Sequence, residues 1–162
     1  QTREVYLHCC KWGFMALVGS DRASFSEIID DRKLQRPYAR IANGDPFSGK
    51  AVQSKTGWKW KFCPVWRWSN PSIKDILSNL LKEPGYIALD TPDVWRVHIE
   101  AEVKVRVKNP MTGRERLVWK QIGKNNHLLD CECMAIVGAA LYGRLKVSPA
   151  SLTESEFDNG EG

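Results

Sequence analysis

The chain has 162 residues, of which 43% are hydrophobic, and this is enough for one domain with a core of its own. Its net charge of +5 hides an asymmetry: the last twelve residues hold four acids and no base, so the other 150 carry +9. A body this basic favours a polyanionic partner, although basic surfaces also serve solubility alone. No run of eighteen apolar residues and no charged-then-apolar leader is readable, so we expect a soluble protein without a membrane span or signal peptide.

The five cysteines occur as Cys9-Cys10, Cys63 and Cys131-x-Cys133. Their number is odd, and no pair has the two-residue spacer that is typical of zinc ribbons. We therefore expect free thiols that pack as small hydrophobic side chains in a reducing compartment, in preference to a zinc site.

The opening residues predict a helix over Thr2–Trp12, because Val5, Cys9 and Trp12 recur at helical spacing, with Thr2 as its N-cap and Gly13 as its C-cap. The apolar run Phe14–Val18 then predicts a short strand covered on both faces. A helix that leads directly into such a strand is half of an α/β unit. The other half would precede Gln1, so we expect this sequence to be an excerpt of a longer protein.

A long polar stretch follows, from Gly19 to about Gly57, in which we expect irregular structure with one short helix over Ser26–Leu34. The segment Gly44–Ala51 imitates a phosphate-binding P-loop. However, Ala51 lacks the hydroxyl that would bind magnesium, no apolar strand precedes the segment, and a Gly-rich loop is the preferred interpretation.

The residues Trp58–Phe62 alternate between aromatic and basic and predict a half-buried strand, whereas Pro64 should end the pairing or lie at a sheet edge. Four tryptophans within eleven residues could stack on nucleic-acid bases, but core packing is the commoner role for tryptophans on one strand face. Asn70 is expected to cap a helix that runs from Pro71 to Lys82 with an apolar stripe.

Gly85–Leu89 predicts another short strand, and a helix should follow from Val94 to about Glu102 with Val94, Val97 and Ala101 facing inward. Asp90 would lie at the carboxyl end of that strand, where α/β folds place their chemistry. An N-cap role for Asp90 is the favoured alternative, and Asp21 has the same two interpretations.

Residues 103–120 predict a β-hairpin, because the first strand alternates strictly and Asn109–Gly113 is rich in turn residues. Two rows of cations would lie along this ribbon and bind the phosphates of a nucleic acid without reading its sequence. The alternative is an ordinary solvated face. The candidate DNA-binding residues, which include one lysine beyond the second strand, are Lys104, Arg106, Lys108, Arg114, Arg116, Lys120 and Lys124.

The stretch Leu128–Leu145 is apolar or small almost all the way round, which predicts a helix covered on most sides. Asp130 stands out in it, because burying an isolated carboxylate is costly unless a metal ion, a cation or N–H donors compensate. Asn126 and His127 share its helical face, whereas Glu132 points elsewhere. A structural acid stabilised by the helix dipole is an equally open interpretation.

The segment Asn126–Glu132, after a lysine-rich run and before a small-residue helix, resembles the end of the nuclease domain in lambda-type (GpA-like) phage terminase large subunits. Further similarity lies in Gln1–Tyr6, which resembles the helix start after the second aspartate-bearing strand of the family. Phe14–Gly19 resembles the family's next strand, and Pro84–Tyr86 with the basic hairpin also fits. Val18 departs from the family pattern, in which a lysine often precedes the glycine.

The resemblance implies an α/β, RNase H-like nuclease fold, of which residues 1–148 would be the later part: a mixed sheet flanked by helices, plus the basic hairpin, incomplete at its N-terminus. Residues 149–162 would be an acidic disordered tail or linker. It further implies a two-metal endonuclease that cuts concatemeric double-stranded DNA, with Asp130 as catalytic and metal-binding acid. Oxygen ligands beside a phosphate favour Mg²⁺ or Mn²⁺. The secondary candidates are Asn126, His127, Asp90 and Asp21.

By the same resemblance the partners would be the rest of the large subunit, the small terminase subunit and the portal or procapsid, in the cytoplasm of a bacterial host. The family's other metal acids should lie before Gln1, so the 162 residues alone should show little cutting. Two alternatives stay open. One is a non-catalytic nucleic-acid-binding module that uses the hairpin and the tryptophan-rich strand, and the other is a packaging piece whose basic surface meets portal or capsid protein.

Overall fold

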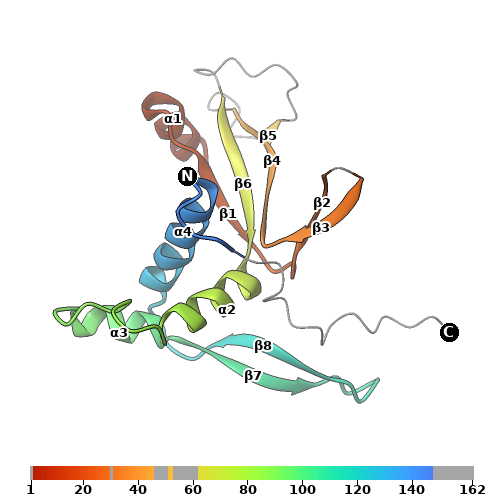
Figure 1. Cartoon of the computed structure of the whole chain (residues 1–162), viewed down its shortest axis with the longest axis vertical. Coiled ribbons are helices and arrows are strands. Elements are labelled where there is room, and N and C mark those ends of the chain that lie inside the picture. Colours follow the sequence, from red (N-terminus) through yellow and green to blue (C-terminus); the bar gives the residue numbers. More distant parts are fainter. Residues whose placement is uncertain (1, 30, 46–50, 53–61, 148–162) are drawn as a thin grey trace. The chain divides into compact units, whose positions relative to one another are not determined.

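The structure is a computed structural model that describes residues 2–29, 31–45, 51–52 and 62–147 (Figure 1). The described chain forms two compact units, and the boundary between them in the sequence falls inside one helix, after Ser72. Both units mix helices and strands, so the predicted α/β class is confirmed at this level. None of the helices in these residues is long and apolar enough to cross a membrane.

The first unit is built on a four-stranded sheet in the order β1-β6-β4-β5 (Figure 1). Strand β1 runs parallel to β6, whereas β4 runs antiparallel to both β6 and β5. Strands β2 and β3 form a separate hairpin. The elements of this unit are α1 (Thr2–Trp12), β1 (Ala16–Ser20), β2 (Phe25–Ile29), β3 (Arg32–Arg36), β4 (Tyr38–Gly44), β5 (Ala51–Val52) and β6 (Cys63–Ser69).

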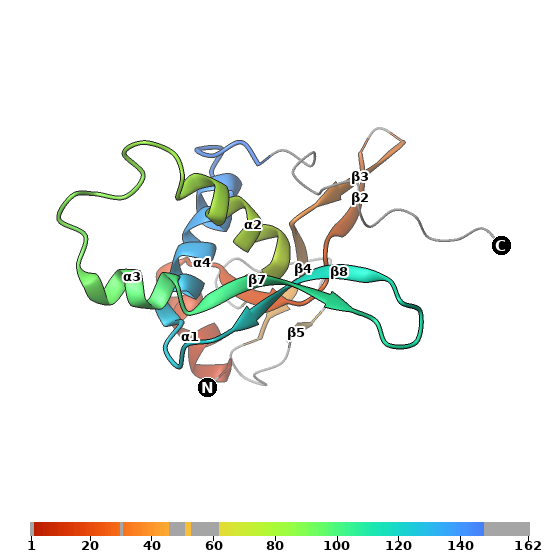
Figure 2. The same ribbon diagram turned by 90° about the horizontal axis from the view of Figure 1, so that it is seen from below.

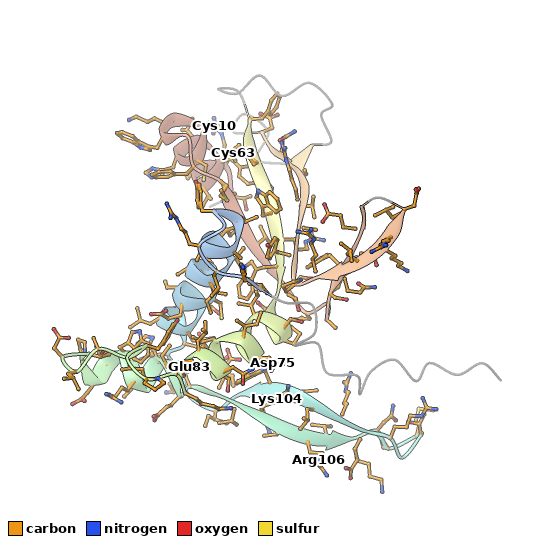
Figure 3. All side chains as sticks on the ribbon, viewed as in Figure 1. Cys10, Cys63, Asp75, Glu83, Lys104 and Arg106 are labelled. Carbon is orange, nitrogen blue, oxygen red and sulfur yellow. The ribbon has the colours of Figure 1, made fainter. Side chains whose placement is uncertain are left out.

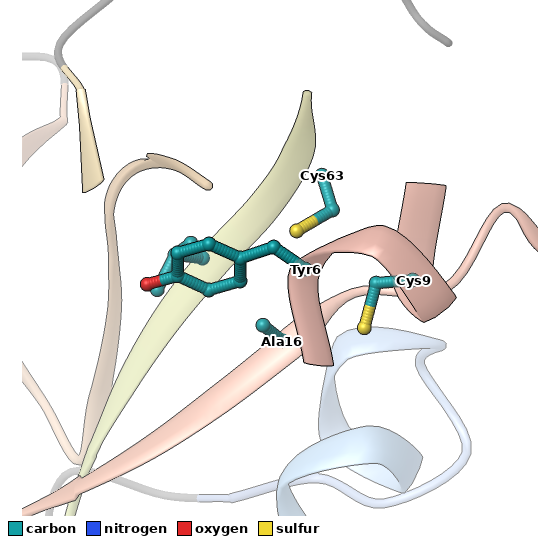
Figure 4. Close-up of a cluster of buried hydrophobic side chains, with 5 residues drawn as sticks. Tyr6, Cys9, Ala16 and Cys63 are labelled. Carbon is teal, nitrogen blue, oxygen red and sulfur yellow. The ribbon is translucent and has the colours of Figure 1, made fainter. Parts of the chain in front are cut away.

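Helix α1 packs one face against this sheet, and Tyr6 and Cys9 are its buried residues (Figure 4). They contact Ala16, Cys63 and Val65 from β1 and β6. A Cβ atom at Gly44 would lie 2.7 Å from the Tyr6 ring, so the absence of a side chain there lets the tyrosine reach the sheet. The core of this unit therefore depends on aromatic and thiol side chains from α1.

The helix predicted over Thr2–Trp12 is confirmed, and Gly13 ends it with a φ of +69°. Of the three residues at helical spacing, Cys9 is buried, whereas Val5 and Trp12 are about half exposed. The strand after it is also less covered than expected: β1 is an edge strand of the sheet, and Val18 is exposed. Edge position, which local hydrophobicity does not encode, explains this difference.

The helix predicted over Ser26–Leu34 is wrong, because β2 and β3 pair there as a hairpin. Asp31 has a φ of +60°, and Ile29 pairs with Arg32, so the strands are joined by two residues. Aspartate tolerates this left-handed backbone, which suits Asp31 to a short connection between two strands. Strand β4 follows directly, so the region is more regular than the composition suggests.

Pro64 was expected to end strand pairing or to lie at a sheet edge. It does not end the pairing, because it lies near the start of the inner strand β6, with Asn43 as its partner on β4. The missing N–H is tolerated there because β1 pairs with β6 only from Val65 onward. The central residues of the P-loop-like segment, 46–50, and most of the tryptophan-rich strand, 58–61, lie outside the described residues.

The second unit contains most of α2 (Asn70–Leu80), together with α3 (Asp93–Ile99), β7 (Glu102–Lys108), β8 (Glu115–Gln121) and α4 (His127–Leu141). Strands β7 and β8 form the predicted antiparallel hairpin. The two strands cross in projection in Figure 2, as is usual for a twisted two-stranded ribbon. The predicted helices near 71–82 and 128–145 are confirmed as α2 and α4. The buried apolar residues described in this unit are Ile73, Leu77, Ala101, Leu129, Cys133, Ile136 and Val137.

The strand predicted over Gly85–Leu89 is wrong, because these residues form turns and bends, and the Leu89 side chain is fully exposed. Gly85 has a φ of +80°, which breaks an extended run. Asp90 is therefore neither at the end of a strand nor an N-cap, since α3 begins at Asp93 after Pro92.

The inward face predicted for the next helix is also wrong, because Val94 and Val97 are exposed whereas Trp95 and His98 are half-buried. Trp95 and His98 both form hydrogen bonds to α4, and these bonds fix which face of α3 turns inward. Ala101 is buried as predicted, but it lies in the turn before β7, where Gly123 approaches it closely.

Candidate carboxylate site and basic ribbon

The first turn of α4 holds the main candidate, Asp130. Asn126 is the N-cap residue, and its carbonyl oxygen accepts the Asp130 N–H at 3.1 Å. Asp130 is half-buried, and its carboxylate has no hydrogen bond or ion pair with any described residue. The positive end of the helix dipole therefore stabilises the charge of Asp130, but no described side chain forms a contact that neutralises it.

The neighbouring acid Glu132 is in a different situation. Its carboxylate accepts hydrogen bonds from Trp95 Nε1 at 2.9 Å and from the Tyr86 hydroxyl at 3.4 Å. Burial, reinforced by this nearby negative charge and hydrogen bond, raises the pKa of Tyr86 to about 12. Glu132 thus joins α4 to α3 and the loop before it, and the prediction that it points away from Asp130 agrees with these partners.

A third acid, Glu102, was not singled out from the sequence. It heads β7 and forms an ion pair with Lys74 of α2 at 2.6 Å, with both side chains more than nine-tenths buried. Its other oxygen accepts the Asn126 Nδ2–H at 2.9 Å. Asn126, predicted as a secondary site residue, therefore holds the start of α4 against β7 and α2. The signal in the sequence was Lys74, which directly follows Ile73 on the buried side of α2.

Cys133 lies one helical turn after Asp130 and is completely buried. Burial raises the pKa of its thiol to about 12. Lys74 opposes this rise, whereas Asp130, Glu102 and Glu132 add to it, in that order. Three carboxylates, of Asp130, Glu102 and Glu132, are therefore near enough to this buried sulfur to affect it, and they are called here the carboxylate cluster.

His98 contributes a further contact to the same turn, because its Nδ1 accepts the Leu128 N–H at 3.3 Å. An accepting Nδ1 requires the neutral ring with its proton on Nε2. His127, the other histidine considered, is exposed, and its ring centroid lies 6.2 Å from that of His98. These contacts come from α3 and leave the Asp130 carboxylate untouched.

The ribbon β7–β8 has two chemically different faces. The cross-strand partners Lys104 with Trp119 and Arg106 with Leu117 share one face, because directly opposite residues point the same way. Val107 with Arg116 and Val103 with Lys120 share the other. The two rows of cations therefore lie on opposite faces of the ribbon, because the pairing register, which the sequence left open, separates them.

On the first face, called here the inner face, two cations are paired with acids, and Figure 3 shows Lys104 beside Asp75 of α2. Lys104 Nζ lies 2.8 Å from Asp75 Oδ1, and Trp119 Nε1 donates to the same oxygen at 3.0 Å. Arg106 pairs with Glu115 of the neighbouring strand at 3.3 Å. Two of the predicted DNA-binding cations are thus already paired within the protein, and the base of the ribbon is fixed to α2.

The second face, the outer face, contains Val103, Val105, Val107, Arg116, Val118 and Lys120. Both strand acids, Glu102 and Glu115, are on the inner face, so the outer face carries only positive charge. Arg116 and Lys120 are exposed, and among the described residues neither forms a hydrogen bond or ion pair. Arg114 is exposed one residue before β8.

The remaining predicted residues do not join the carboxylate cluster. Lys108 and Lys124 are exposed, the first at the end of β7 and the second before α4. Asp90 is exposed in a turn. Asp21, in the other unit, accepts a hydrogen bond from Asn70 Nδ2 at 3.4 Å.

The described residues do not by themselves make a metal centre. No group of three or more His, Cys, Asp or Glu side chains in these parts of the chain is arranged to hold an ion. Glu102 and Glu132 are already committed to partners, which leaves Asp130 as one available carboxylate. Since a hard divalent ion takes six or more oxygen ligands, further donors would be needed.

No protein-family model matches the chain, and no curated protein and no solved structure matches it significantly.

Proposed function

We propose that this chain is the later part of the nuclease domain of a phage DNA-packaging terminase large subunit, with the RNase H-like fold that the sequence resemblance implies. In this proposal the domain cuts concatemeric double-stranded DNA in the bacterial cytoplasm, with Mg²⁺ or Mn²⁺ bound in part by Asp130. The remaining large subunit, the small subunit and the portal or procapsid would be its partners.

The observation that carries the proposal is the contrast between Asp130 and the acids around it. Glu102 and Glu132 each have two partners, whereas the Asp130 carboxylate has none among the described residues. Acids below the surface of a fold usually have hydrogen-bond or ion-pair partners, so a half-buried carboxylate without one is a candidate functional group. Asp130 is also the residue that occupies the acid position in the Asn-His-Leu-Leu-Asp-Cys segment.

The proposal requires acids from outside residues 1–162, because one carboxylate does not hold a divalent ion tightly. The part that this chain plays is accordingly to fix Asp130. Asn126 and His98 anchor the first turn of α4, and the Lys74–Glu102 pair holds Asn126 in place. DNA would be held by the outer face of the ribbon β7–β8, through its phosphates.

Nicking of a supercoiled plasmid in Mn²⁺ tests the proposal. The 162 residues alone should cut little or not at all, and a polypeptide that also carries the strands that we place before Gln1 should cut. In that longer polypeptide Asp130→Asn should reduce cutting by at least about a hundredfold, as is usual for loss of a catalytic charge. Cutting that survives the substitution would refute the catalytic assignment.

A second candidate function is that of a non-catalytic nucleic-acid-binding module. The observation that favours it is the outer face of the ribbon, which carries cations and no acid. In this case Asp130 would be structural, and Asp130→Asn would change only stability. DNA affinity measured beside the nicking assay separates the two, since a nuclease variant loses cutting while its affinity for DNA stays the same.

A further inference from the structure

The ribbon β7–β8 ends in an arm that extends away from the helices of its own unit. The base of the ribbon is fixed, because Lys104 and Trp119, which are cross-strand partners, both bond to Asp75 of α2. Beyond that pair every residue from 106 to 117 is exposed, whichever face it lies on. Figures 1 and 2 both show the turn of the ribbon at the end far from α3 and α4. A two-stranded hairpin that packs against nothing is only marginally stable, so this arm is suited to a partner that surrounds it.

The turn at the end of the arm is held in one conformation by its own hydrogen bonds. Asn109 Oδ1 accepts the N–H groups of Met111 and Thr112 at 2.9 and 3.2 Å. The Asn109 carbonyl oxygen accepts the Gly113 N–H at 2.9 Å, and the Asn109 N–H donates to the Arg114 carbonyl oxygen at 2.7 Å. Gly113 has a φ of +70°, which favours glycine. The turn therefore presents its tip in a defined orientation.

The side chain at that tip is apolar. Met111 is 94% exposed, and Pro110 precedes it. Lys108 and Arg114 are exposed on either side of the turn, and residues 108–114 include no acid. An apolar tip between two cations fits a partner with negative charge outside and apolar surfaces inside. Duplex DNA has this character, because two phosphate backbones border its stacked bases.

The arm is long enough to reach the bases of a duplex. From Lys104 to Lys108, β7 continues for four residues, or about 13 Å at about 3.3 Å per residue, and the turn lies beyond. The minor groove is about 7.5 Å deep, so Met111 can reach its floor while the base of the ribbon stays outside. Lys108 lies on the inner face and Arg116 on the outer face, so an arm inside a groove presents a cation to each backbone.

We propose that the arm enters the minor groove of duplex DNA and that Met111 wedges between two neighbouring base pairs, unstacking them and kinking the duplex. Apolar wedges, methionine among them, act in this way in minor-groove-binding proteins, where contacts to the bent DNA offset the unstacking. This inference rests on the proposed DNA binding by the ribbon and deepens it. The cations of the outer face hold the backbone, and Met111 makes the contact favour steps that unstack easily.

The wedge is tested by the affinity of the full chain for two 20-base-pair duplexes of the same sequence, one with a central T·T mismatch. A mismatch lowers the cost of unstacking, so the unaltered chain should bind the mismatched duplex about tenfold more tightly. Met111→Ala should lose this preference, whereas its slope of log K against log salt should not change, because no phosphate contact is removed. The matched control is Leu89→Ala, which alters another fully exposed apolar residue of the same unit and should keep the preference.

A 2-aminopurine base next to the mismatch reports the unstacking directly. Its fluorescence should rise when the unaltered chain or Leu89→Ala saturates the duplex, and should stay near that of the free duplex with Met111→Ala. Both substitutions are at exposed positions, so urea denaturation should give nearly the same free energy of unfolding for all three proteins. Equal affinity of the unaltered chain for the two duplexes, or a mismatch preference that survives in Met111→Ala, would overturn the inference.

The same assay separates this inference from the proposed function. If Arg116→Gln/Lys120→Gln leaves the affinity for both duplexes unchanged, the ribbon is not the DNA surface, and the proposed binding site and the wedge both fail. If that variant binds more weakly but Met111→Ala still prefers the mismatch, the proposed DNA surface stands and the wedge alone fails.

Discussion

The ion pair between Lys74 and Glu102 places two opposite charges in the interior of the second unit. Both side chains are under one-tenth exposed, and Asn126 satisfies a second oxygen of Glu102. A buried pair of this kind adds little to stability compared with apolar residues, but removing one partner leaves the other charge uncompensated. The pair therefore fixes the position of Asn126, and Asn126 in turn fixes the first turn of α4, which carries Asp130.

Glu102→Gln should lower the free energy of unfolding by about 3–5 kcal/mol, because the Lys74 ammonium loses its counter-charge in the interior. Urea denaturation gives this number. The control Lys104→Gln breaks the more exposed pair with Asp75, for which a loss of about 1 kcal/mol or less is expected. Equal losses in the two variants would contradict the structural role given to Glu102.

Asp130→Asn should change the free energy of unfolding much less, by about 1 kcal/mol at most, because the carboxylate has only the helix end to stabilise it. The small change is expected because the Asp130 carboxylate has no partner among the described residues, and the same observation supports its assignment to a functional site. Denaturation in the presence of EDTA excludes any effect of bound metal. A loss as large as that of Glu102→Gln would show that Asp130 is a structural acid.

The buried thiols predict how stability depends on pH. Burial raises the pKa of both Cys63 and Cys133 to about 12, from an ordinary value of about 9.0. Above pH 9 the unfolded chain loses these protons while the folded chain keeps them, so the free energy of unfolding should fall as pH rises toward 12. Cys133→Ala should make this decline less steep. Stability that stays constant from pH 8 to 11 would contradict the burial of the thiols.

At the scale of elements, the hairpin shows what local sequence can and cannot predict. Strict alternation in residues 103–108 and the Asn-Pro-Met-Thr-Gly turn predicted both strands correctly. The pairing register across the turn determines which cations share a face. A shift of one residue would have put the cations of β8 on the same face as Lys104 and Arg106. The acid partners of Lys104 and Arg106 lie on helix α2 and on strand β8, so the periodicity of β7 did not reveal them.

The cations on the outer face of the ribbon should contribute more to DNA binding than the paired cations on the inner face. Arg116→Gln/Lys120→Gln should weaken binding to duplex DNA and reduce the slope of log K against log salt by about 2, since each lost phosphate contact changes it by about 0.9. The matched control Lys104→Gln/Arg106→Gln removes two cations that already have acid partners and should have a smaller effect. Equal effects would show that the pairs open when DNA binds.

The helices illustrate a second limit. Helix α4 was recognised from its apolar and small residues, and α2 from Asn70-Pro71 and its regular stripe. The orientation of α3 was missed because its valines suggested one face, whereas hydrogen bonds from Trp95 and to His98 selected the other. Polar atoms on large aromatic side chains need partners when buried, and those partners lie 37 residues away for Trp95 and 30 for His98.

At the scale of the whole molecule, composition and periodicity were enough for the mixed α/β class, because that class follows from which elements occur. They did not predict the β2–β3 hairpin, whose turn depends on one aspartate in a left-handed conformation. They also singled out Asp130 but not Glu102 or Lys74. The reason is that a buried ion pair looks, in sequence, like two ordinary polar residues on separate elements.

The proposed nuclease activity depends on Asp130 being a metal ligand rather than a structural acid. The most direct test is the affinity for Mn²⁺, measured by titration calorimetry on a polypeptide that includes the strands proposed to precede Gln1. Asp130→Asn should weaken Mn²⁺ binding by at least about tenfold while leaving the free energy of unfolding in EDTA nearly unchanged, since even outer-shell changes at metal sites cost this much. Unchanged Mn²⁺ affinity in the variant would contradict the central claim.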